Sequence, residues 1–408
     1  MKKNIAFTIV AKNYLHYALT LSSSFSKQNP EFEFRIYISD GVTDDIKKLA
    51  QDKNLPIFDA MTTQDAPDFL KMAFYYEVTE YCTAIKPFLI RQLFAEGNSI
   101  VCYIDPDIYF YSSLDGAVCS TLVDDEILLT PHICSPIGDS LRPSESDHLI
   151  SGTYNLGFIA LRQGPESTKL VDWWCKKCLD ECFTDPINGL FVDQKWINLV
   201  PGMFSKVHIS RNLGLNVAYW NFHERILDES HRVNGSVPLT FFHFSGINVD
   251  SFANISKYQN RFSLANRPDL RPYFEAYAAE VRSNRFPEFE KDYAFNQYSD
   301  GKQISILARR LYFWNRGSLA SPFQSTAAEA AFKQILKKSW IKEKGGIDKK
   351  PAGAEVAGKK KILDRIFFGL LLLLGPQRYG HLMRYFGLAS SLNNHKFLDA
   401  NASGATSD

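Results

Sequence analysis

The sequence of 408 residues has almost no excess of charge of either sign: 46 lysines and arginines face 45 aspartates and glutamates, a formal net charge of +1. Without a strong positive field, a nucleic-acid-binding protein is not expected. Cysteine is also scarce, since an odd total of seven is spread along the chain. That pattern argues against a disulfide framework and favours a reducing compartment.

Long apolar segments are lacking as well. Behind the weakly basic residues 1–4, the apolar stretch is short and is broken by Lys12 and Asn13, so we expect no signal peptide. The most apolar run, residues 362–374, is too short to span a bilayer. We find no internal repeats. These absences predict a cytoplasmic protein, or one bound peripherally at the inner face of the membrane.

What the sequence does contain is enough apolar material for a large packed core, 45% of all residues, with 14% aromatic. Near-continuous apolar runs, expected to be strands, occur at residues 5–10, 34–38, 100–104, 127–129 and 156–161. Expected helices at residues 14–26, 87–95 and 170–183 alternate with them. Apolar strands alternating with helices predict an α/β fold whose mostly parallel, Rossmann-like sheet is flanked by helices.

The C-terminal third has a different character. After a domain at residues 1–262, we expect a helical extension at 263–341, with helices at 269–284 and 325–340. A flexible linker is predicted at 342–361, an apolar and basic helix at 362–392, and a disordered tail at 393–408. Because residues 359–387 combine basic and apolar side chains, this segment either lies in a membrane interface or docks on the main domain.

Two carboxylates, Asp105 and Asp107, follow the apolar run 100–104, where a buried strand is expected to end. In open α/β sheets, ligands bind beyond the carboxyl ends of the strands. Pro106 restricts the backbone between the two acids. Carboxylates one residue apart suit a divalent cation that also holds a phosphate. The alternative is a solvated turn with two turn-forming acids.

Four other motifs place polar residues at the ends of predicted elements. They are Asn13-Tyr14 after the first strand, Asn155 with Gly157 at another strand, Asp193-Gln194 before an apolar helix, and His243 among phenylalanines. Helix-start N–H groups, an amide and a glycine suit a nucleotide or a sugar, and a histidine can complete a metal site. Each motif also has a structural interpretation: a helix cap, a strand-entry turn, an N-cap or a core histidine.

Cys175, Cys178 and Cys182 form the one cluster of cysteines. Their spacing places them on one face of a predicted helix that also carries Trp174, which favours core packing. The alternative, a zinc site, needs a fourth ligand that the sequence does not identify.

Taken together, these motifs resemble the GT-A-fold glycosyltransferases. The closest likeness is to the retaining family 8 type, which includes glycogenin and bacterial galactosyltransferases, and within it to predicted bacterial surface-polysaccharide transferases. The resemblance covers residues 4–262. No single motif is specific, but six occur in the family's order: Asn13-Tyr14, Lys86 at the head of a helix, Tyr103 to Asp107, Tyr154 to Gly157, Asp193-Gln194, and His243 to Gly246.

The resemblance implies a metal-dependent, retaining enzyme of the hexosyltransferase type. It would move a sugar from a nucleotide-diphosphate sugar to a glycan or lipid-linked acceptor, in surface polysaccharide synthesis. Asp105, Asp107 and His243 would bind Mn²⁺ or Mg²⁺ on the donor diphosphate. Donor-binding roles would fall to Asn13, Tyr14, Lys86, Asn155, Gly157, Gly246 and Lys257. Asp193 and Gln194 would be catalytic residues beside the donor sugar, and Trp220 and Asn221 would border the acceptor.

Three departures from the family pattern concern the donor. Ala11-Lys12 stand where the first loop usually carries an acid that reads uracil, so a UDP-sugar is favoured but the base stays open. The usual Lys-Pro-Trp after the late histidine motif is absent, and Lys257 is its candidate replacement. Lys86 stands where the family usually has arginine, which keeps the charge but loses the guanidinium fork. Inverting relatives share the fold, so the stereochemistry rests on resemblance alone.

Two other functions stay open. A carbohydrate-binding protein could retain the fold without turnover, although the intact Asp105, Asp107 and His243 argue against it. A haloacid-dehalogenase-type phosphatase also places Asp-x-Asp after an apolar strand. However, Tyr109 stands where that family has threonine or valine, and its motif normally opens the chain.

Overall fold

The computed structural model describes residues 4–64, 66–251, 254–289, 293–341, 343 and 353–399, without the side chains of 353–359 and 361. The chain forms two compact units. The first comprises residues 1–69 and 78–294, and the second comprises residues 70–77 and 295–408. Most of the predicted linker at 342–361, and residues 400–408 of the predicted tail at 393–408, lie outside the described residues.

A seven-stranded sheet forms the centre of the first unit. Its strands, in spatial order, are β10 (Val207–Ile209), β6 (Ile127–Pro131), β7 (Tyr154–Arg162), β4 (Ile100–Ile104), β1 (Asn4–Val10), β2 (Phe32–Ile38) and β3 (Ile57–Asp59). β7 runs antiparallel to both of its neighbours, and the other pairs are parallel. The predicted α/β class with a mostly parallel sheet is therefore confirmed.

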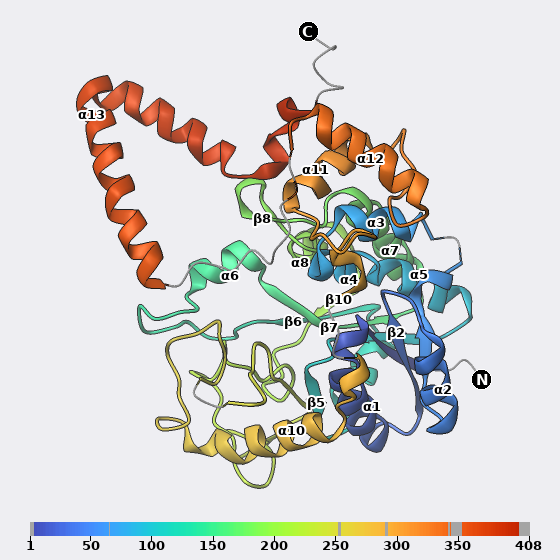
Figure 1. Cartoon of the computed structure of the whole chain (residues 1–408). Coiled ribbons are helices and arrows are strands. Elements are labelled where there is room, and N and C mark those ends of the chain that lie inside the picture. The colour runs from blue at the N-terminus through green and yellow to red at the C-terminus, as the bar shows by residue number, and fades with distance from the viewer. Residues whose placement is uncertain are drawn as a thin grey trace. The chain divides into compact units, whose positions relative to one another are not determined.

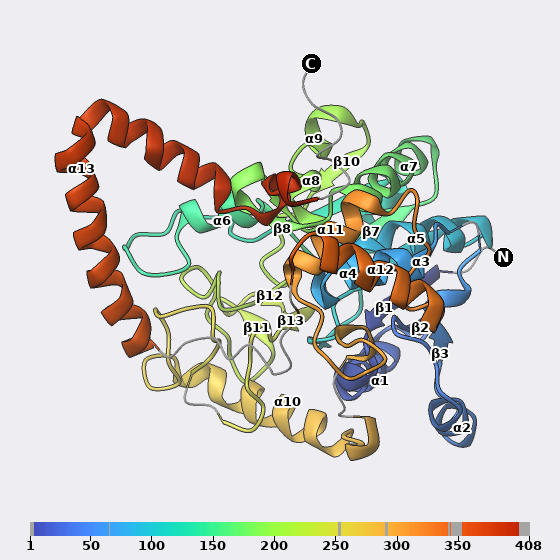
Figure 2. The ribbon, with the colours of Figure 1, turned by 45° about the horizontal axis from the view of Figure 1, so that its top comes forward.

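The strands are apolar on both faces because helices cover both faces. All five residues of β4 are buried, as is nearly all of β1 and β7. α4 (Val78–Ala84), α5 (Lys86–Ala95) and α7 (Pro165–Asp180) lie on one face, while α1 (Leu15–Gln28) and α10 (Arg271–Ser283) lie on the other (Figures 1 and 2). The remaining helices of this unit are α2 (Asp44–Asp52), α6 (Glu145–Ser151), α8 (Gln194–Ile197) and α9 (Val200–Met203).

In the described part of the chain, three short antiparallel pairs lie outside the main sheet. They are β5 (Ile108–Phe110) with β13 (Phe241–His243), β8 (Thr184–Asp185) with β9 (Leu190–Phe191), and β11 (Arg232–Val233) with β12 (Val237–Pro238). The first pair matters most for the site, because its register sets His243 opposite Ile108. A residue 135 positions later in the chain is thereby brought next to the two aspartates that precede β5.

The second unit has an aromatic core of its own. Phe74, from α3 (Phe69–Tyr75), packs against Tyr312 of α11 (Ile306–Asn315) and Phe332 of α12 (Thr326–Lys338). The buried guanidinium of Arg309 donates hydrogen bonds to the backbone carbonyls of Ala73, Phe74 and Tyr76, at 3.2, 2.7 and 2.9 Å. Segment 70–77 is thus fixed to α11 by both apolar and polar contacts.

The last helix, α13 (Gly353–Ala389), contains the apolar run that the sequence singled out. It is bent at Gly375, whose φ of 72° and ψ of 164° are not helical, and Pro376 follows (Figure 1). Two limbs result, one on each side of Gly375. Within the part of the chain that the structure describes, no helix is both long enough and apolar enough to cross a membrane.

Candidate metal and donor-binding site

Asp105 and Asp107 stand in the turn where β4 ends and β5 begins. The N–H of Asp105 donates to the carbonyl of Gly157 at 2.7 Å, and its own carbonyl accepts from the N–H of Ile108 at 3.2 Å. The hydroxyl of Tyr103 donates to Asp105 Oδ1 at 2.7 Å. Burial raises the pKa of Asp105, with Asp107 adding to the rise and Lys86 and His243 opposing it. Carboxylates held this close gain from a cation between them.

His243 is the third member of this group. The N–H of Phe244 donates to the carbonyl of Asp107 at 2.8 Å, which aligns the two segments. His243 Nε2 lies 2.9 Å from Asp107 Oδ1 and 3.8 Å from Asp105 Oδ2. One ligand atom from each of the three residues lies within 4.8 Å of the others, the one such cluster found among the described residues. Two carboxylates and an imidazole in this arrangement could hold a metal ion.

A chain of hydrogen bonds orients the imidazole of His243. Asn155 Oδ1 lies 3.2 Å from His243 Nδ1, and Asn155 Nδ2 lies 3.2 Å from His132 Nε2. His132 Nδ1 in turn lies 3.3 Å from the carbonyl of Thr153. Since that carbonyl only accepts, His132 carries its proton on Nδ1 and accepts at Nε2. The amide therefore donates to His132 and accepts from His243 Nδ1, which leaves His243 Nε2 directed at the aspartates.

Gly157 leaves room for this imidazole. A Cβ at position 157 would lie only 2.4 Å from His243 Cε1 and 2.8 Å from Asn155 Oδ1. Real Cβ atoms do not approach other atoms so closely, so any other residue here would displace the histidine or the amide. The glycine that was predicted to contact the donor thus also contacts a metal-ligand candidate directly.

Lys86 and Asp193 form a fully buried ion pair beside Asp105. Lys86 Nζ lies 2.6 Å from Asp193 Oδ2 and donates to the carbonyl of Leu156 at 3.0 Å. It also lies 4.0 Å from the centre of the Tyr103 ring. Burial raises the pKa of Asp193, although Lys86 opposes the rise. With Lys86 already held by Asp193, the pair orders the wall of the site.

Gln194 joins two backbone segments at the same place. Its Oε1 accepts from the N–H of Leu156 at 2.9 Å, and its Nε2 donates to the carbonyl of Ser151 at 2.9 Å. The side chain therefore fixes the entry of β7 to the end of α6.

A cavity of about 510 Å³ connects most of these residues. Of the predicted site residues, Lys86, Asp105, Asn155, Gly157, Asp193, Gln194 and Trp220 line it. Sequence reasoning missed other lining residues, among them His132, Arg142, Asp147, His148 and Tyr258. Ser144 and Asp147 form a capping box, so the sequence could have predicted the start of α6. Nothing local in the sequence relates that helix to Asp105.

Asn13 and Tyr14 follow β1, as predicted. Asn13 Oδ1 is buried with no hydrogen-bond partner, whereas the Tyr14 side chain is 51% exposed. Burial of its hydroxyl raises the pKa of Tyr14, Lys257 opposes the rise, and Asp107 adds to it. Gly246 has a φ of 73°, and the N–H of Lys257 donates to its carbonyl at 3.1 Å.

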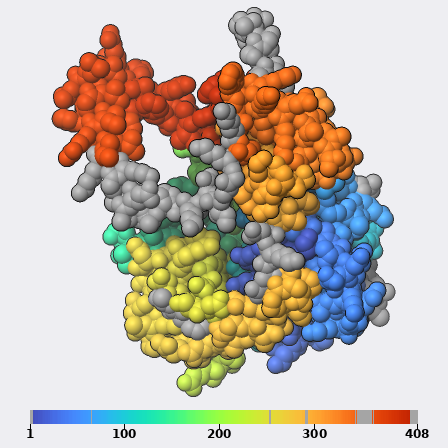
Figure 3. Space-filling view, viewed as in Figure 1, coloured from blue at the N-terminus to red at the C-terminus, as the bar shows by residue number. Residues whose placement is uncertain are grey.

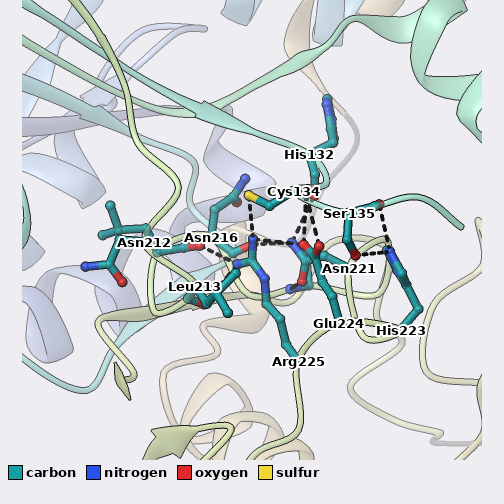
Figure 4. A network of polar contacts seen from close by, with 12 residues as sticks. His132, Cys134, Ser135, Asn212, Leu213, Asn216, Asn221, His223, Glu224 and Arg225 are labelled. Carbon is teal, nitrogen blue, oxygen red and sulfur yellow. Dashed lines mark hydrogen bonds and ion pairs between the residues drawn. The ribbon is translucent and has the colours of Figure 1, made fainter. Parts of the chain in front are cut away.

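Trp220 and Asn221 differ in their access to the cavity. The Trp220 ring meets the His243 ring edge to face with centres 5.1 Å apart, and its buried Nε1 has no hydrogen-bond partner. Asn221 is fully buried, and its amide donates to the carbonyls of His132 and Asn216 at 3.0 and 2.9 Å (Figure 4). The amide of Asn221 thus holds the turn that carries Trp220.

A buried arginine network supports the same turn (Figure 4). Arg225 donates to the carbonyls of Leu213 and Leu215, and its Nη2 lies 3.4 Å from Glu224 Oε1. Glu224 accepts from the backbone N–H of Cys134 at 3.0 Å. The turn beside the cavity is therefore rigid.

The three clustered cysteines are not part of the group formed by Asp105, Asp107 and His243. Cys175 and Cys178 are on the buried face of α7, and Cys182 is buried just after it. Among the described residues, Cys175, Cys178 and Cys182 do not form a group of ligands placed to hold a metal ion. Core packing accounts for the three cysteines.

Comparison with known proteins gives relatives of low identity. No family model matches the chain. The uncharacterized protein YfnF of Bacillus subtilis is 26% identical over 281 residues, which are 66% of this chain and 89% of the relative. The uncharacterized protein YfnD of the same organism is 22% identical over 248 residues, which are 59% of this chain and 77% of the relative. Among solved structures, galactosyltransferase LgtC in complex with donor and acceptor sugar analogs is similar at 15% identity and a TM-score of 0.39, over 70% of this chain and 98% of that one. The glycosyltransferase GlyE of Streptococcus pneumoniae is similar at 14% identity and a TM-score of 0.40. The similarity covers 76% of this chain and 73% of the GlyE chain.

Proposed function

We propose that this protein is a metal-dependent glycosyltransferase with a GT-A-type domain, which moves a sugar from a nucleotide-diphosphate sugar to a glycan or lipid-linked acceptor. The observation that carries the proposal is the cluster of Asp105, Asp107 and His243 at the carboxyl end of β4. The orientation of His243 Nε2 toward both acids supports a ligand role, since a metal requires the unprotonated nitrogen.

Bound by these three residues, Mn²⁺ or Mg²⁺ would supply Lewis-acid stabilisation of the departing diphosphate. The residues around it have complementary tasks. Asn13 and Tyr14 would contact the nucleotide, and the N–H groups and amine near Gly246 and Lys257 would contact phosphate. The unpaired carbonyl oxygen of Asn13 suits a donor group on the base or ribose.

Asp193 and Gln194 would form the pocket for the donor sugar. The 2.6 Å contact with Lys86 holds Asp193 in place, so we assign it to hydrogen bonding with sugar hydroxyls. A retaining reaction needs no strong protein base if the leaving phosphate takes the acceptor proton. That part of the proposal rests on the family resemblance.

The nucleotide is proposed to be UDP. The first loop lacks its own acid, but Asp40, just beyond β2, accepts from the N–H of Lys12 at 3.0 Å, and Lys12 Nζ lies 3.3 Å from its carboxylate. An acid therefore stands at this loop, supplied from the neighbouring strand. Lys12 is already paired with it and is not assigned to the diphosphate.

Replacement of one ligand tests the proposal. Asp107→Ala should lower Mn²⁺-dependent release of nucleotide from a UDP-sugar about a hundredfold or more, since the stabilisation lost is several kcal/mol. Calorimetric Mn²⁺ binding should weaken in parallel. The exposed Asp45 gives a matched control. Asp45→Ala removes an acid from α2, which is distant in sequence from Asp107. Unchanged turnover in Asp107→Ala would refute the metal site.

A thermal-shift screen separates transfer from binding alone. Nucleoside diphosphates with Mn²⁺ should raise the melting temperature once the ligand exceeds its dissociation constant. A carbohydrate-binding protein would instead respond to free sugars, with or without Mn²⁺, and would release no nucleotide. That result would replace the glycosyltransferase proposal.

A further inference from the structure

Helix α13 exposes an unusual amount of apolar side chain. Nine large apolar side chains of this helix are 46% to 80% exposed: Ile362, Leu363, Ile366, Phe368, Leu372, Leu373, Tyr385, Phe386 and Leu388. Figure 3 shows the side chains of α13, in red, on the surface. Singly scattered apolar residues on a surface are ordinary, but this many on one helix, six before Gly375 and three after it, mark a binding surface.

The same helix carries a local excess of positive charge. Lys360, Arg365, Arg378 and Arg384 are exposed on α13, and Asp364 is the one acid between residues 360 and 389. The chain as a whole is almost neutral, so this excess is specific to the helix. An apolar protein partner would not need these bases, whereas an anionic lipid surface attracts both kinds of side chain.

The dimensions of α13 favour a position along the surface of a bilayer. The apolar run 362–374 has a length of about 20 Å as a helix, against a hydrocarbon core of about 30 Å. The bend at Gly375 then turns the chain, and the second limb again mixes bases with Tyr385, Phe386 and Leu388. Two short limbs of this kind suit the boundary between headgroups and acyl chains.

We propose that α13 binds the surface of an anionic phospholipid bilayer, with the apolar residues inserted and the bases in contact with lipid headgroups. The proposal rests on side chains outside the candidate metal site. Its outcome is therefore independent of the proposed reaction, and Asp107→Ala should bind vesicles as the unmodified chain does.

Sedimentation of the full chain with lipid vesicles tests this directly. Vesicles of phosphatidylcholine and phosphatidylglycerol should retain the protein, and vesicles of phosphatidylcholine alone should retain much less. Arg378→Gln with Arg384→Gln should weaken binding about 25-fold, roughly fivefold for each base. Leu372→Gln with Leu373→Gln should weaken it about tenfold or more. All four replaced side chains are exposed. Circular dichroism should therefore show an unchanged fold.

Matched controls come from other exposed positions. Lys47→Gln with Lys48→Gln removes two exposed bases from α2, and Val123→Gln removes an apolar side chain that is 72% exposed. Both should bind anionic vesicles normally. Equal binding to neutral and anionic vesicles, or full binding by the Leu372 and Leu373 variant, would overturn the proposal.

A fluorescence measurement locates the helix. In Leu372→Trp, the new indole should be quenched by brominated acyl chains of anionic vesicles, whereas Val123→Trp should not. A dimer that dissociates when Leu372 and Leu373 are replaced, together with no quenching, would assign the surface to a second copy of the chain instead.

Discussion

At the scale of single residues, the amide of Asn155 decides which nitrogen of His243 faces the aspartates. Because Asn155 donates to His132 and accepts from His243 Nδ1, the other imidazole nitrogen is presented to Asp107. Burial alone would lower the pKa of His243, but Asp107 and Asp105 outweigh it and raise the pKa. Metal binding at Nε2 would therefore release a proton. The role of Asn155 in the site is to position His243.

We expect Asn155→Ala to weaken Mn²⁺ binding about 10- to 100-fold, as is usual when a partner that orients a metal ligand is lost. Calorimetry without any sugar donor separates this effect from contact with the donor. Asn98→Ala is the control, because Asn98 is also buried and its amide also donates a hydrogen bond, in this case to the backbone carbonyl of Leu93. Equal affinities for Asn155→Ala and Asn98→Ala would contradict the positioning role.

At the scale of elements, the start of α5 and the start of α8 are joined by the ion pair of Lys86 and Asp193. Both side chains are 1% exposed, so each charge depends mainly on the other for its compensation. A buried pair of this kind adds little net stability, but removal of one partner leaves a buried charge unbalanced.

Lys86→Met should therefore lower the free energy of unfolding by about 3–5 kcal/mol. Adding Asp193→Asn should recover much of that loss, because the uncompensated carboxylate disappears. Urea unfolding of the two single variants and the double variant measures the coupling. Additive losses in the double variant would show that the two side chains act independently.

At the scale of the whole molecule, one buried histidine makes stability depend on pH. Burial, with a contribution from His148, lowers the pKa of His132 from 6.5 to about 3. Because its pKa is lower in the folded state, folding favours neutral His132. The contribution of His132 to the free energy of unfolding is therefore complete above pH 6.5 and is lost as the pH falls toward 3. Between pH 8 and pH 5 the chain should lose about 2 kcal/mol of stability through this group.

The variant His132→Asn removes that group and should flatten the pH profile of unfolding. His208→Asn serves as the control, because the His208 side chain is 41% exposed. Chemical unfolding at pH 5 and pH 8 for all three proteins gives the slopes. Parallel profiles for His132→Asn and the unmodified chain would exclude His132 as the cause.

Much of the central sheet could be predicted, because long apolar strands can be recognised from the local sequence alone. The runs at 5–10, 34–38, 100–104, 127–129 and 156–161 all fall on strands of the sheet. β3, β5, β10 and β13 were not predicted, since each has only three residues and depends on a distant partner. The antiparallel direction of β7 is likewise set by tertiary pairing.

The candidate site divides in the same way. Asp105 and Asp107 could be selected because they follow a recognisable apolar strand, whereas the local pattern around Asp193 equally fits an N-cap and its proposed role came from the family resemblance. The link from His243 to His132 could not be predicted, because Asn155 can point its amide in several directions and only packing around Gly157 selects one. The pairing of Lys86 with Asp193 joins residues 107 positions apart and leaves no local signal.

The interleaving of the two units has a consequence for how the chain is made. Residues 70–77 belong with residues 295–408, and the carbonyls of Ala73, Phe74 and Tyr76 bind Arg309. A ribosome must therefore synthesise more than two hundred further residues before this early segment meets its partners. Until then Phe74 lacks Tyr312 and Phe332, the aromatic side chains against which it packs, so this segment can reach its final packing only late in synthesis.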